Sequence, residues 1–150
     1  MADALVLVGA LGATWAMTGV IWVIQLVHYP IFDAVDRGTD DDLWRRFGDR
    51  HRRAISLVVG PFMLVEGVTG IWLVADPPGS MSVFPPLVAA LLMALAYGTT
   101  ALVSVPLHER LTASFDADAH RRLCSTNWIR TGAWTARAVV IAVIAVVAFT

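Results

Sequence analysis

The sequence contains no lysine and only one cysteine, and both shortages restrict what the chain can do. All eleven basic residues are arginines. The single cysteine, Cys124, cannot form a disulfide within one chain or supply a thiolate metal cluster. The sequence also lacks a phosphate-binding loop, a dinucleotide-binding fingerprint and a nucleophile elbow. Nucleotide chemistry and serine chemistry of the soluble type therefore have no support.

Charge is scarce as well, and long apolar runs take its place. Charged residues make up 15% of the 150 residues and hydrophobic residues 57%, with a mean hydropathy of +0.68. A soluble domain of this size would not need so apolar a composition. Apolar runs occupy residues 4–27, 54–75, 86–107 and 131–150. Because each run is long enough to cross about 30 Å of hydrocarbon, we predict four transmembrane helices, with the lipid bilayer as their partner.

The distribution of arginine predicts the orientation in the membrane. None of the arginines lies in the N-terminus, in residues 76–85 or at the C-terminal end. Positive residues are retained on the cytoplasmic side, so residues 33–53 and 108–130 are expected in the cytoplasm and both termini outside the cell membrane. The N-terminus has no basic residue before its apolar run, and we therefore do not expect a cleaved secretory signal.

The second helix is predicted to begin inside the cytoplasm. Thr39 precedes three aspartates in the arrangement of a capping box, and apolar residues then recur at helical spacing. We expect this helix to run from near Asp40 to about Ala75. Gly60 and Pro61 predict a kink within it.

The second half of the chain resembles the first at an offset of 76 residues. "QLVHYPIF" then aligns with "ALVSVPLH", and Pro30 and Pro106 are each predicted to end a span. The identical pairs are Leu26 and Leu102, Val27 and Val103, Pro30 and Pro106, Asp42 and Asp118, Arg45 and Arg121, and Arg46 and Arg122. We predict a single integral membrane domain over residues 1–150. Its fold would be an all-α four-transmembrane-helix bundle of two tandem hairpins, 1–75 and 77–150, with cytoplasmic helix extensions.

Unusual polar residues gather near the cytoplasmic ends of the predicted spans. The candidate catalytic residues are His28, His51, His108, Asn127 and Arg130. The candidate pocket residues are Gln25, Tyr29, Glu66, Arg137, Trp22 and Trp134. A histidine could move a proton, while Asn127 and Arg130 could stabilise negative charge that develops on oxygen. The alternative is that the histidines bond lipid headgroups and helix ends, and that the tryptophans only pack between helices. No pair of histidines has metal-ligand spacing on one helix, so no metal site is assigned.

Glu66 lies near the middle of the second predicted span, where a carboxylate costs about 2.5 to 3.5 kcal/mol on insertion scales. It should therefore face the bundle and be paired or protonated. Arg137 is the candidate partner. Three alternatives stay open: a structural ion pair, a directly functional carboxylate, or a protonated Glu66 bonded to Thr99, Thr100 or a backbone carbonyl.

Two short stretches of the second half carry a resemblance to a known family. "VPLHERL" and "TNWIRTGAW" resemble the anthrone oxygenase-like family of small four-helix membrane proteins, with P-L-N-x-x-L before W-x-x-N-x-x-R-T. The matching residues are Pro106, Leu107, Leu111, Asn127, Arg130 and Thr131, and His108 stands where that family usually carries Asn. The fungal members that name the family are similar to oxygenases that convert anthrones to anthraquinones. The resemblance covers about residues 103–137.

Two functions from different classes remain open. The first is an oxidoreductase or oxygenase-like protein that acts on a hydrophobic aromatic or quinone-like molecule near the cytoplasmic face. The sequence leaves its cofactor unknown. The second is a small transport, channel or membrane-complex assembly subunit in which Glu66 and Arg137 control a polar path. We favour the first because the polar residues cluster at one depth.

Two further expectations concern partners. Six Arg are matched by six Asp in residues 33–53, which argues against nucleic acid binding. A homo-oligomer is favoured by a stripe of small residues that suits close helix packing, namely Gly9, Gly12, Ala13, Ala16 and Gly19.

Overall fold

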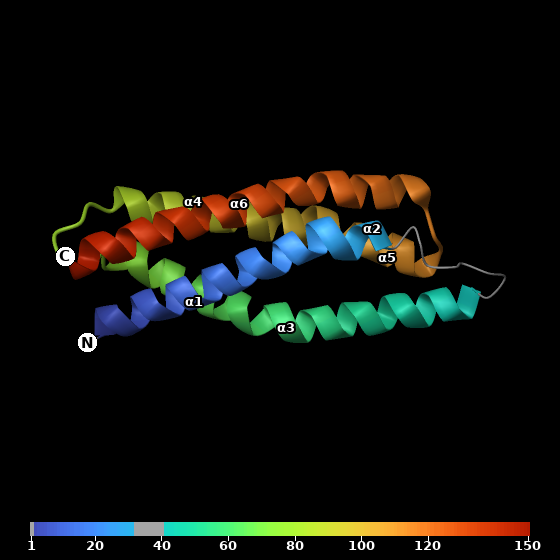
Figure 1. Ribbon diagram of the computed structural model, residues 1–150, viewed down its shortest axis with the longest axis horizontal. Coiled ribbons are helices and arrows are strands. Elements are labelled where there is room, and N and C mark those ends of the chain that lie inside the picture. Colours follow the sequence, from blue (N-terminus) through green and yellow to red (C-terminus); the bar gives the residue numbers. More distant parts are fainter. Residues whose placement is uncertain (1, 32–40) are drawn as a thin grey trace.

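The computed structural model describes residues 2–31 and 41–150, which form an elongated helical bundle (Figure 1). The elements in chain order are α1 (Ala2–Val23), η1 (Ile24–His28), α2 (Tyr29–Ile31), α3 (Asp41–Ala75), α4 (Phe84–Thr99), η2 (Thr100–Ser104), α5 (Val105–Ala113) and α6 (Ala117–Phe149). Continuous helix over Asp3–Ile31, Trp44–Ala75, Phe84–Ala113 and Ala117–Phe149 gives four apolar segments of 29 to 33 residues. The predicted all-α four-helix bundle is confirmed, and the chain is a multi-pass membrane protein.

The second predicted helix is α3, and it begins within one residue of the predicted start. It continues through Gly60 and Pro61 to Ala75, and it is bent in Figure 1. The predicted capping residue Thr39 lies outside the described residues. At the start of α6, Asp116 caps the helix by accepting hydrogen bonds from the amides of Asp118 and Ala119.

Pro30 and Pro106 each follow a π-helical turn, η1 and η2. A proline inside an α-helix lacks the amide donor, and its ring collides with the carbonyl four residues earlier. In the two turns the amides of Tyr29 and Val105 donate to the carbonyls of Ile24 and Thr100, five residues back. This wider turn accommodates the proline. The prediction that the helix ends at Pro106 was wrong, because α5 continues to Ala113.

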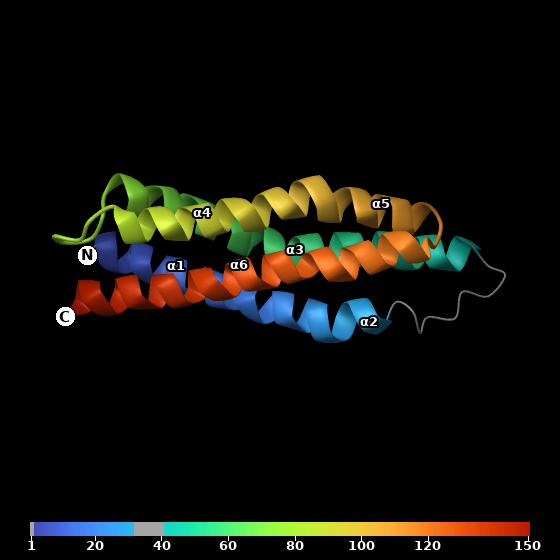
Figure 2. The ribbon, with the colours of Figure 1, turned by 90° about the horizontal axis from the view of Figure 1, so that it is seen from above.

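The helices alternate in direction around the bundle. α1 contacts α3 and α6, and α4 contacts the same two helices. The chain termini lie at one end, while α2, α5 and the beginning of α3 lie at the other (Figures 1 and 2). Arg45 to Arg53 in α3 and Arg110 in α5 are therefore far from both termini.

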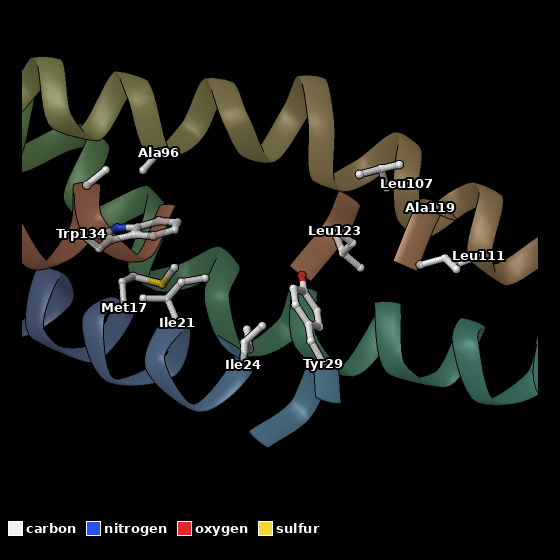
Figure 3. Close-up of a cluster of buried hydrophobic side chains, with 11 residues drawn as sticks. Met17, Ile21, Ile24, Tyr29, Ala96, Leu107, Leu111, Ala119, Leu123 and Trp134 are labelled. Carbon is white, nitrogen blue, oxygen red and sulfur yellow. The ribbon is translucent and has the colours of Figure 1, made fainter. Parts of the chain in front are cut away.

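The exterior is rich in apolar side chains, and the interior holds several polar side chains among apolar ones, which is unlike a soluble protein. Glu66, Asn127 and Arg137 are fully buried, whereas Leu57 and Leu102 are 79% and 80% exposed. Lipid tails solvate such leucines, so helices in a membrane associate through close packing and internal polar contacts. Apolar side chains fill the space between these contacts, and one cluster extends from Trp134 and Met17 to Leu111 (Figure 3).

The small residues of α1 are divided between the inside and the outside of the bundle. Ala13 is buried, and Gly9 lies against Thr69 of α3. Gly12 and Gly19 have open space beside them. Part of the predicted oligomerisation face therefore packs within this chain.

Candidate functional site

A cavity of about 770 Å³ lies in the half of the bundle that carries the arginines. Its walls come from α1, η1, α2, α3 and the segment from Thr100 to Glu109, and one residue of α6, Arg130, also reaches it. The apolar lining includes Met17, Val20, Ile21, Ile24, Ile55 and Val59, and the polar lining includes Tyr29, His51, Thr100, Ser104, His108 and Arg130. Apolar walls with a few converging polar groups are typical of sites for drug-sized molecules.

Three histidines and a tyrosine form a connected group at the cavity. Tyr29 Oη lies 3.0 Å from His108 Nε2, and His28 Nε2 lies 2.9 Å from His51 Nδ1. The rings of His51 and His108 are 5.6 Å apart between centroids. Tyr29 is buried and extends from α2 towards Leu123 of α6 (Figure 3). The π-helical turns η1 and η2 precede Tyr29 and His108 and so set the direction of both side chains.

A chain of hydrogen bonds through side-chain amides holds Arg130 in place. Its Nη1 donates to Asn127 Oδ1 at 3.0 Å and to Ser104 Oγ at 3.1 Å. Asn127 Nδ2 donates to Gln25 Oε1 at 2.9 Å, and Gln25 Nε2 donates to the carbonyl of Cys124 at 3.4 Å. Asn127 is fully buried, so it positions the guanidinium and does not itself line the cavity.

The guanidinium of Arg130 has no carboxylate partner among the described residues. Its hydrogen bonds to Ser104 and Asn127 go to neutral groups. Arg130 is 8% exposed, and its buried Nε atom has no hydrogen-bond partner. The guanidinium lies 5.5 Å from the centre of the Trp134 ring. A buried cation is costly unless it is paired, so this site favours an anionic or electron-rich group in the cavity.

The predicted site residues separate into three groups. Tyr29, His51, His108 and Arg130 line the cavity. Behind them, His28 contacts His51, Asn127 contacts Arg130, and Gln25 contacts Asn127. Trp22 lies outside the cavity, 37% exposed, with its indole donating to Thr135. Glu66, Arg137 and Trp134 form a second polar cluster. Ser104 was missed by the sequence reasoning, although the offset of 76 residues aligned it with His28 and so marked its position.

The predicted pair of Glu66 and Arg137 is confirmed. Glu66 Oε1 accepts from Arg137 Nε at 3.3 Å, and both side chains have no exposure. Trp134 Nε1 donates to the other carboxylate oxygen at 3.0 Å, and Arg137 Nη1 donates to the carbonyl of Ala89 at 2.6 Å. This cluster joins α3, α4 and α6 and is closed to solvent, which suits a structural role better than a polar path.

Among the described residues, no three His, Cys, Asp or Glu side chains converge closely enough to hold a metal ion. No family model, curated protein or solved structure matches the chain.

Proposed function

We propose that the protein is an oxygenase-like membrane protein that binds a hydrophobic aromatic or quinone-like molecule in this cavity. The observation that carries the proposal is the convergence of His51, His108, Tyr29 and Arg130 on one space with apolar walls. The resemblance of residues 103–137 to the anthrone oxygenase-like family supports the same class of ligand.

The reaction we propose begins with loss of a proton from an activated ring carbon. A nitrogen of His51 or His108 accepts the proton, and the electron pair moves to the ring oxygen, which becomes negative. Arg130 stabilises this oxygen, and Asn127 and Ser104 hold the guanidinium in place. For an anthrone, dioxygen is the oxidant: the ring CH₂ becomes C=O, one O₂ is consumed and one water is released.

We further propose that the arginine-bearing end faces the cytoplasm, as retention of positive charge on that side predicts. The cavity then lies near the inner headgroups. We also propose that the two hairpins are internal repeats. This is supported by element boundaries 76 residues apart: η1 and η2 begin at Ile24 and Thr100, α2 and α5 at Tyr29 and Val105, and α3 and α6 at Asp41 and Ala117.

The test is oxygen consumption by the purified protein in lipid nanodiscs supplied with anthrone. We expect one O₂ for each anthraquinone formed, at a rate above that of empty nanodiscs. His51→Ala and Asn127→Ala should each lower this rate, by about 10² to 10⁴ if the lost group takes part in proton transfer or holds the oxyanion site.

Leu26→Ala is the matched control, because Leu26 is 59% exposed on η1 and does not line the cavity. It should keep the full rate. Insertion and folding of each variant are checked by circular dichroism and gel filtration. If the double variant of His51 and Asn127 is folded and fully active, the assigned site is wrong, and if wild type does not exceed empty nanodiscs, the oxygenase proposal is wrong.

A further inference from the structure

The geometry points to a lateral entrance: we propose that the cavity admits its ligand sideways from the bilayer, between α3 and the η2–α5 segment. The ligand class is an amphipathic aromatic anion whose negative oxygen pairs with Arg130. This inference rests on the proposed function only in sharing its cavity, since it concerns the charge and route of the ligand and not the reaction.

The entrance is a gap with a closed contact at each end. Towards the middle of the bundle, Tyr97 Oη donates to the carbonyl of Met63 and joins α4 to α3. At the arginine-bearing end, Gly48 of α3 lies against Thr112 of α5, because a Cβ on Gly48 would be 2.9 Å from Thr112 Oγ1. Between these two contacts the cavity separates α3 from the other wall.

Both rims of the gap are exposed, although they also line the cavity. Ser56 forms the α3 rim, and Val105, which is 47% exposed, forms the other. Both residues fall within the apolar runs predicted to span the membrane, 54–75 and 86–107. The outside of the gap is therefore lipid, and a molecule dissolved in the bilayer reaches the cavity without crossing the headgroups.

The charge of the cavity selects the ligand. Three arginines line it, Arg52, Arg53 and Arg130, against two carboxylates, Asp49 and Glu109. Asp49 is already paired with Arg52 at 2.7 Å. Arg130 is the buried cation of this set, and the apolar walls of α1 and α3 would surround the body of a ligand whose anionic head reaches its guanidinium. An aromatic carboxylate or phenolate has both parts.

Two fluorescent probes of equal size test the charge: anthracene-2-carboxylate and anthracene-2-carboxamide. Binding to the protein in nanodiscs is followed by energy transfer from tryptophan, since Trp134 lies beneath Arg130. The carboxylate should bind about 10-fold to 100-fold more tightly, the range expected for a hydrogen bond to a charged group. Arg130→Gln should abolish this preference, and Arg130→Lys should keep part of it. Equal binding of the two probes to wild type would overturn the anionic ligand class.

Stopped-flow mixing tests the route. Val105→Trp fills the gap and should slow association of the carboxylate at least 10-fold, and Ser56→Trp on the opposite rim should do the same. Leu102→Trp is the matched control, because Leu102 is 80% exposed in η2 and does not line the cavity. An unchanged rate in both rim variants, with folding intact, would overturn lateral entry.

If the probes behave as expected but anthrone is not oxidised, the inference stands and the oxygenase reaction fails. If neither probe binds, the inference fails, and the oxygenase proposal is decided by the anthrone assay alone.

Discussion

Replacing Glu66 by Gln should destabilise the bundle more than replacing Glu66 and Arg137 together. The single change keeps the side-chain volume but removes the carboxylate that faces Arg137 Nε at 3.3 Å, with both side chains fully buried. The guanidinium keeps its bonds to Thr14 and the carbonyl of Ala89, and it is left as a buried charge without a counter-ion. Breaking a buried pair in this way costs about 3 to 5 kcal/mol.

The double variant Glu66→Gln/Arg137→Gln removes both charges and leaves two amides that can bond each other. We expect a loss of about 1 to 2 kcal/mol, well below the sum of the two single losses, because polar replacement of a whole pair leaves no uncompensated charge. The four proteins are unfolded reversibly by sodium dodecyl sulfate in mixed micelles. Tryptophan fluorescence is a suitable signal because Trp134 donates to Glu66.

The surface pair of Arg121 and Asp118 is the matched control for this cycle, since both side chains are at least 75% exposed. Arg121→Gln should change the free energy of unfolding by less than about 1 kcal/mol. The coupling between the two buried residues would be refuted by additivity. In that case the stability lost in the double variant would equal the sum of the losses in Glu66→Gln and Arg137→Gln, within about 0.5 kcal/mol.

Two further predictions concern the end of the bundle far from the chain termini. Gly48→Ala should destabilise the protein despite the better helix propensity of Ala, because the new Cβ meets Thr112 Oγ1 at 2.9 Å. When Thr112 is also replaced by Ala, Gly48→Ala should instead stabilise the protein by up to about 1 kcal/mol in the same unfolding assay. Destabilisation by Gly48→Ala in both backgrounds would contradict the steric explanation. The backbone amides of Ala119 and Asp118 and the nearby Arg110 lower the pKa of Asp116 from its ordinary value of 3.8. The cap therefore stabilises α6 fully above about pH 4, and this stabilisation is lost as the pH falls through the lower pKa that Asp116 has in the folded protein. Asp116→Asn should remove this part of the acid dependence of unfolding, and an unchanged acid profile would show that the cap does not contribute.

The sequence was sufficient for the fold because each apolar run is long enough to span a bilayer and each is separated by breakers or arginine-rich segments. It also indicated the pairing of Glu66 with Arg137, since a carboxylate in a membrane needs a counter-ion and one arginine lies within the fourth span. Both inferences depend on the cost of exposing polar groups to lipid. That cost is the same whichever neighbours the helices have.

The residues that line the cavity were predicted less accurately than the fold. Gln25 and Asn127 were expected to line a pocket, but they face each other behind Arg130. Trp22 was expected beside a ligand and lies on the outside of the bundle, with its indole donating to Thr135. These differences arise from the rotation of each helix about its own axis, which apolar periodicity fixes poorly when the exterior is apolar as well.

The two π-helical turns act as one-residue insertions in otherwise α-helical spans. One additional residue turns everything beyond it by about 100° relative to a regular helix. Tyr29 and His108, which follow η1 and η2, share a hydrogen bond, and each lies beyond the same irregularity in its own helix. Removing one residue from a single turn would leave a span that still crosses the bilayer, while the phenol and the imidazole no longer face each other.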